Sequence, residues 1–148
     1  MADFESPEND PAALLRFLKI VYAAMAGSVV MYLIVLEVIA SDLEPQPVGA
    51  LRTGLIVLAA ILATVVFFLR FSILAGLLSP VGPALREGRA AKLRTCYIIC
   101  FTLAETVGLL GFVVRFVGGS RADAFPFFVG SFILLAACFP RVPDDLAT

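Results

Sequence analysis

The sequence predicts an all-α integral membrane protein, folded as an antiparallel four-helix transmembrane bundle with both termini in the cytoplasm. Of its 148 residues, 61% are hydrophobic and only 16% are charged, and the mean hydropathy is +1.01. A soluble domain carries about a quarter charged residues, so a core of this size could not bury so much apolar surface. Four apolar runs approach the roughly 20 residues that cross a bilayer, which makes lipid the expected solvent.

The first predicted span lies near residues 17–40. Asp10 suits an N-cap and Pro11 suits the first helical position, so the helix is expected to begin there. The preceding segment is acidic and the apolar run is long, unlike the basic start and short apolar core of a signal peptide. We therefore expect this helix to be retained.

The second span is expected near residues 51–78, after a polar loop rich in proline. Its apolar run exceeds the bilayer thickness, so the helix can tilt. The third span is expected near residues 96–116. The basic segment before it, beginning after Pro83, is expected to form a helix that continues into this span.

The fourth span, near residues 124–139, follows a Gly-Gly-Ser turn and is the shortest, because Pro140 and Pro143 discourage further helix. The connections are short, so consecutive spans are expected to be antiparallel neighbours. The predicted organisation is therefore an acidic N-terminal tail, a four-span membrane domain and a C-terminal tail, comprising residues 1–12, 13–139 and 140–148.

The distribution of Lys and Arg predicts the orientation, because cytoplasmic loops carry an excess of both. The side that holds both termini and the middle loop has Arg16, Lys19, Arg86, Arg89, Lys92, Arg94 and Arg141. The opposite side has Arg52, Arg115 and Arg121. This bias places the termini in the cytoplasm, and we expect the cytoplasmic (inner) membrane of a bacterium as the location.

Glu105 is the most informative residue, because it stands in the third span eleven residues after Arg94, roughly 16 Å into the membrane. An ionised acid at that depth costs at least a few kcal/mol unless it is compensated. Arg70 of the second span is a possible partner, in a buried ion pair that fixes helix register. Alternatively, Glu105 is protonated and hydrogen-bonded to a hydroxyl or carbonyl group, while Arg70 extends to the inner interface. In the functional alternative, Glu105 binds and releases a proton or ion.

Other residues have expected structural roles. Glu37 and Arg115 are expected to pair at the outer face, where water reaches both. Small residues are expected to allow close helix packing, namely Gly27, Ser28, Ala104, Gly108 and Gly111. A basic collar is expected to contact anionic lipid headgroups, namely Arg86, Arg89, Lys92 and Arg94. The three cysteines are expected to be reduced packing residues, and no metal site or cofactor is expected.

The segment "LAETVGLLGF" around Glu105 resembles two membrane families. It is similar to the acid-bearing helix of the rotor proteolipid (c subunit) of rotary ATPases, and to the membrane glutamate motif of the small multidrug resistance exporters. Either resemblance implies that Glu105 is an ion-binding or proton-binding carboxylate. In both families the acid lies in a different span, and the exporters use a tryptophan that this chain lacks.

Two function classes follow. The first is an accessory or assembly subunit that interacts through its helices with the lipid bilayer, with partner membrane proteins or with further copies of itself. The second is a small transporter or ion-translocating protein that uses Glu105. An enzyme is not expected, because the chain has no histidine, the commonest general base near neutral pH. A nucleic-acid partner is not expected either, since the net charge is −1.

Overall fold

The computed structural model describes residues 11–39, 49–78 and 88–141. About 92% of these residues are helical, and they include no strand. The elements are α1 (Pro11–Ile39), α2 (Gly49–Phe68), the π-helical segment η3 (Leu69–Leu74), α3 (Ala75–Leu78), α4 (Arg89–Phe116) and α5 (Arg121–Ala137). The predicted all-helical fold is confirmed. The α2, η3 and α3 segments follow one another directly, so the π-helical turn interrupts one long helix.

Three helices in the described part of the chain are long and apolar enough to cross a membrane: Ala12–Ile39, Gly49–Leu77 and Arg89–Phe116. They support the assignment to the membrane proteins. The fourth helix, α5, has 17 residues and is about 26 Å long, which is shorter than a hydrocarbon core of about 30 Å.

The helix boundaries follow local sequence signals. α1 begins at Pro11, where a proline costs no hydrogen bond, while Asp10 lies outside the described residues. α4 begins at Arg89, earlier than the apolar run, because the basic segment is already helical. The turn after α4 has Gly118 at φ 101°, a conformation that glycine adopts without strain. The start of α5 is fixed by Ser120.

Ser120 and Asp123 form a capping box at the start of α5. The Asp123 backbone N–H donates to Ser120 Oγ at 3.2 Å, and the Ser120 backbone N–H donates to Asp123 Oδ2 at 3.1 Å. This reciprocal arrangement satisfies two backbone donors that would otherwise lack partners at a helix N-terminus.

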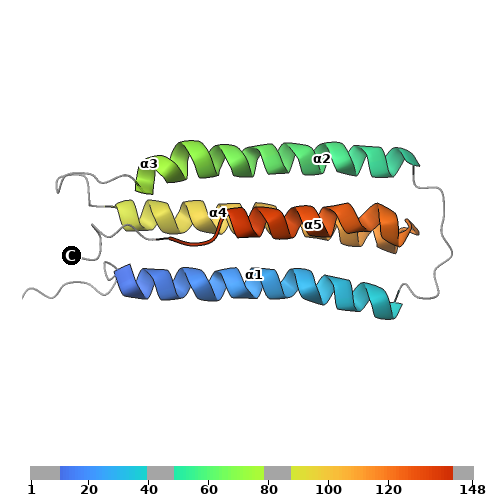
Figure 1. Ribbon diagram of the computed structural model, residues 1–148, viewed down its shortest axis with the longest axis horizontal. Coiled ribbons are helices and arrows are strands. Elements are labelled where there is room, and N and C mark those ends of the chain that lie inside the picture. Colours follow the sequence, from blue (N-terminus) through green and yellow to red (C-terminus); the bar gives the residue numbers. More distant parts are fainter. Residues whose placement is uncertain (1–10, 40–48, 79–87, 142–148) are drawn as a thin grey trace, which may run out of the picture.

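α4 occupies the centre of the molecule and packs against α1, α2 and α5. Figure 1 shows α1 and α2 on opposite sides of α4 and α5, with the chain running one way in α1 and α4 and the other way in α2 and α5. The prediction that all consecutive spans are neighbours is therefore wrong for α1 and α2. The reason is that both pack against α4 instead of against each other.

The buried side chains are concentrated on α4 and α5. Tyr97 and Phe101 of α4 are fully buried, whereas Val66 is the buried core residue that α2 contributes. α1 contributes Leu18, Val29 and Leu36. The other apolar side chains of α1 and α2 are either partly buried against this core or exposed, as expected of helices with one face toward lipid.

Glycines on α4 set the distance to α5. A Cβ on Gly111 would lie 2.8 Å from Phe127 Cβ, and one on Gly108 would lie 3.1 Å from Ser131 Oγ. Ala104 is fully buried, and its carbonyl accepts a hydrogen bond from Ser131 Oγ at 2.7 Å. Gly27 is different: it is exposed, with no atom within 4 Å of its Cβ position, so the expected packing role of Gly27 is wrong.

We expect Gly111→Ala to destabilise the fold by about 1–3 kcal/mol, because the new methyl group would collide with the Phe127 Cβ and force α4 and α5 apart. Gly27→Ala is the matched control, since its methyl group enters open space and alanine favours helix. Thermal unfolding in detergent measures both. Equal stability of the two variants would contradict close packing at Gly111.

Candidate functional site

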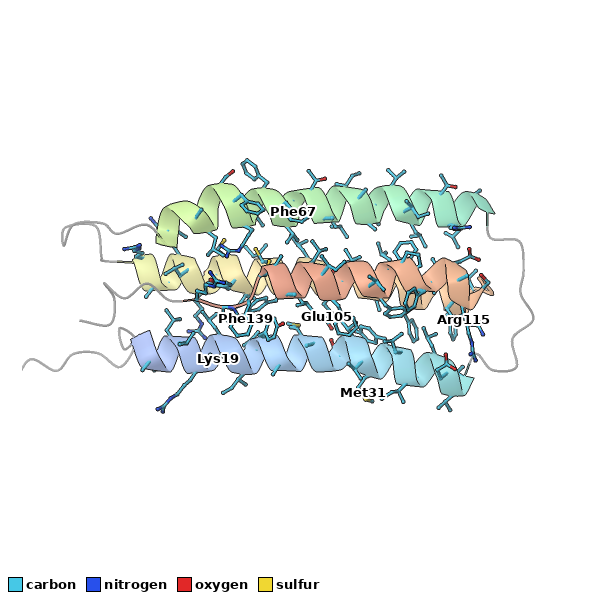
Figure 2. The ribbon with its side chains drawn as sticks, viewed as in Figure 1. Lys19, Met31, Phe67, Glu105, Arg115 and Phe139 are labelled. Atoms are coloured by element: carbon cyan, nitrogen blue, oxygen red, sulfur yellow. The ribbon has the colours of Figure 1, made fainter. Side chains whose placement is uncertain are left out.

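Glu105 lies near the middle of the helices, between α4 and α1 (Figure 2). Its side chain is half-buried on the face of α4 that packs against α1. An acid at the middle of a membrane-spanning helix needs a compensating partner.

The partners of Glu105 are two hydroxyl groups of α1. The Tyr32 hydroxyl donates to Glu105 Oε1 at 2.9 Å, and Ser28 Oγ is in hydrogen-bond contact with the same oxygen. Ser28 and Tyr32 are four residues apart and therefore share one face of the helix. From the sequence, Ser28 was expected to be a packing residue, and Tyr32 was not singled out. The available signal was this pair of hydroxyl side chains at helical spacing in an apolar helix.

Ser28 Oγ has a second acceptor in reach. It lies 2.8 Å from the carbonyl oxygen of Met25, the residue three positions earlier in α1. A serine hydroxyl carries one proton and can donate to one of these acceptors, not to both. The contact between Ser28 and Glu105 therefore depends on which of the two residues supplies the proton.

Arg70 does not form the ion pair with Glu105 that the sequence suggested. Its Nε donates to the carbonyl oxygen of Ala137 at 3.0 Å. Arg70 stands in the π-helical segment η3, where the extra residue in the turn changes the direction of the side chains relative to a regular α-helix. Ala137 is the last residue of α5, so the guanidinium group satisfies a carbonyl at a helix C-terminus.

The outer charges also pair differently from the prediction. Glu37 Oε2 lies 2.8 Å from Arg121 Nη2, in an exposed ion pair of small energetic weight. Arg115 lines the same cavity of about 170 Å³ as Glu37, but its Nη1 donates to the Gly119 carbonyl at 3.0 Å. The expected pair of Glu37 and Arg115 is therefore corrected. The Arg115 side chain thus binds the backbone of the turn that directly follows its own helix.

The basic collar divides into two parts. Arg89 is 3% exposed, and its Nε donates to the Leu77 carbonyl at 2.7 Å. The expected headgroup contact is therefore wrong for Arg89, which binds a carbonyl near the C-terminus of α3. Lys92 and Arg94 are exposed, and the Arg94 guanidinium lies 4.1 Å from the centre of the Phe17 ring. Arg86 lies outside the described residues.

The three cysteines are free and buried. Cys100 of α4 and Cys138, directly after α5, are hydrogen-bond partners, and Arg70 lies close enough for its charge to act on both. Among the described residues, no group of three His, Cys, Asp or Glu side chains is arranged to hold a metal ion. The cysteines thus fill the contact between α4, α5 and η3.

A second ion pair, not anticipated from the sequence, joins α2 to α5. Arg52 Nη1 lies 2.8 Å from Asp123 Oδ1, at the end of the molecule where both helices begin. The Ser120 hydroxyl holds the pKa of Asp123 below its usual range, and the Ser120 backbone N–H and the Arg52 charge act in the same direction. Asp123 therefore remains ionised at neutral pH.

No family model, no curated protein and no solved structure matches this chain. Its fold and site define it as an all-helical membrane protein with one carboxyl group held by hydroxyl groups in mid-helix. Its function therefore has to be inferred from this geometry.

We expect the stabilising effect of Asp123 to depend on pH. Because its pKa is lower in the folded state, the effect is complete above the unfolded-state pKa of about 3.9 and is lost as the pH falls through the folded-state value. Thermal unfolding of the wild type and of Asp123→Asn, from about pH 7 to about pH 3, measures this. The stability difference between them should shrink below about pH 4. A difference that stays constant would contradict this role.

Proposed function

We propose that the chain is a multi-pass membrane protein, with four antiparallel spans and both termini in the cytoplasm, that acts as an accessory or assembly subunit through its helices. The observation that carries the proposal is the contact of Glu105 with Ser28 and Tyr32. This contact holds α1 against α4 in the middle of the membrane. It takes the place of the expected ion pair with Arg70 as the polar contact that fixes helix register.

The count of hydrogen-bonding protons supports a protonated Glu105. Three contacts need a proton: Ser28 with Met25, Ser28 with Glu105, and Tyr32 with Glu105. The two hydroxyl groups supply two protons, and a carboxylic acid supplies the third. With Glu105 protonated, Ser28 donates to Met25, Glu105 donates to Ser28 and Tyr32 donates to Glu105. Glu105 then carries no charge in the hydrocarbon region.

The exposed surfaces of α1 and α2 support an interaction role. Both helices present exposed apolar side chains, such as Ile34 of α1 and Ile61 of α2, to their surroundings. These surfaces are available to lipid or to the helices of a partner protein or second copy. The Lys and Arg bias supports the orientation, and with it a location in the cytoplasmic membrane. We propose no enzymatic activity.

We expect Glu105→Gln to keep the stability of the wild type and Glu105→Leu to lose about 1–2 kcal/mol. The Gln amide oxygen can take the place of Oε1 and accept from both hydroxyl groups without carrying a charge, whereas Leu leaves both hydroxyl groups without this partner. Tyr32→Phe should cost about 0.6 kcal/mol, the mean for an interhelical hydrogen bond in a membrane.

Thermal unfolding in lipid nanodiscs gives these differences. Thr106→Val is the matched control, because Thr106 bonds a carbonyl within α4 and makes no bond to α1. The infrared carbonyl band of a protonated carboxylic acid should be present in the wild type and absent from Glu105→Gln. A loss of stability with Gln as large as that with Leu would show that Glu105 is ionised, and would overturn the protonated contact.

Proton or ion translocation is the second candidate function. It is supported by the partial exposure of Glu105 and by its partners, which are hydroxyl groups and not a fixed cation. A proton held in this way can be released if water reaches the site. Transport then requires a path for water from one face of the membrane.

Labelling of Ser28→Cys tests this second function, in a background where Cys96, Cys100 and Cys138 are replaced by Ser. Ser28 touches Glu105, whereas Ala104 and Gly108 are packed against α5, so position 28 is the better probe. Transport predicts labelling by a membrane-impermeant thiol reagent from one side. Gly27→Cys is the lipid-facing control and should not be labelled. An absence of labelling at position 28 from both sides would exclude a water path and leave the accessory role.

A further inference from the structure

An apolar groove of about 330 Å³ lies between α2 and α5, on the side of the molecule away from Glu105. Small residues line the groove, with Ala59 and Ala63 on α2 and Gly130 on α5. Their short side chains leave the space between the two helices open. A Cβ on Gly130 would lie 3.8 Å from Val107 Cγ1, an ordinary van der Waals contact, so the glycine itself narrows neither wall of the groove. Phe67 and Ile133 line the inner part of the groove.

The groove has a polar mouth. Arg52 and Asp123, the ion pair between α2 and α5, line its outer end. The Arg52 side chain is 47% exposed, and Nη1 is the nitrogen that contacts Asp123, so the ion pair uses only part of the five N–H donors of the guanidinium group. The mouth thus presents an exposed cation and an anion side by side, directly above an apolar cleft.

The groove is long enough for an acyl chain. On α2 its lining runs from Arg52 to Phe67, fifteen residues apart, which corresponds to about 22 Å along a helix. This exceeds half of a hydrocarbon core of about 30 Å, so a chain that starts at the level of Arg52 has room for the full depth of one bilayer leaflet.

We propose that this groove is a binding site for phosphatidylethanolamine, with one acyl chain between α2 and α5, the phosphate on Arg52 and the ammonium group on Asp123. The headgroup charges are complementary to those of the mouth, with the phosphate opposite in charge to Arg52 and the ammonium group opposite in charge to Asp123. A primary ammonium group offers three N–H donors to the carboxylate. A choline group has no such donor, and an anionic headgroup without an ammonium group adds no partner to Asp123 beyond Arg52 and Ser120.

This proposal does not rest on the role of Glu105, which lies on the opposite face of α4. It also gives a function to α2, whose contacts with α5 are few compared with those between α4 and α5. A bound acyl chain would fill the space that the alanines leave.

Native mass spectrometry of the detergent-purified chain tests the proposal, with phosphatidylethanolamine, phosphatidylcholine and phosphatidylglycerol of identical acyl chains as probes. We expect phosphatidylethanolamine to be retained about threefold better than the other two, the size of effect that an exposed ion pair supports. Equal retention of all three lipids would show annular lipid only and would overturn the proposal.

Two pairs of variants separate the groove from the mouth. Ala60→Phe fills the groove and should abolish selective retention, whereas Gly54→Phe is its control, because Gly54 has open space around it and does not line the groove. Arg52→Gln should remove the preference for phosphatidylethanolamine. Arg121→Gln is its control, since Arg121 pairs with Glu37 at the same end of the molecule. Unchanged selectivity in Ala60→Phe or in Arg52→Gln would overturn the site, and the lipid comparison on the wild type remains decisive if a variant fails to fold.

Discussion

A carboxyl group in the middle of an apolar helix must find hydrogen-bonding partners, and in this protein that requirement sets the position of α1. Ser28 and Tyr32 supply the partners, so α1 can occupy only the register and rotation that bring both hydroxyl groups to Glu105. The apolar contacts of α1, such as Leu18 and Val29, add burial without this directionality. The polar contact therefore specifies the arrangement, and the apolar contacts stabilise it.

The arginines of the helical core follow a second constraint, which is that carbonyl groups at helix ends need donors where water is scarce. Arg70 donates to Ala137 at the end of α5, Arg89 to Leu77 in α3, and Arg115 to Gly119 after α4. Each of them was expected from the sequence to meet an acid or a lipid headgroup. In the structure, each of the three arginines donates to a backbone carbonyl.

Hydropathy and helix-start signals were sufficient to predict the helical class and the approximate positions of the helices, because these depend on composition and length. The partners of Glu105 depend on the rotation of each helix about its axis, which changes by 100° with every residue. The π-helical turn at Leu69–Leu74 alters this rotation for Arg70. The segment contains no sequence signal from which the π-helical turn could have been predicted. The lateral order of α1 and α2 was missed for a related reason. A short connection keeps the ends of two consecutive helices near each other, but it does not require the two helices to pack side by side.

The two outer helices are attached to α4 in different ways, and this difference links the two proposals. α1 is held near the middle of α4 by the contacts of the Ser28 and Tyr32 hydroxyl groups with Glu105, which we propose to be protonated. α2 is held by apolar contacts with α4 and by the ion pair of Arg52 with Asp123 at one end. Because α1 and α2 lie on opposite sides of α4 and α5 (Figure 1), a change at one helix need not disturb the other. A proton would thus act on α1, whereas a lipid would act on α2.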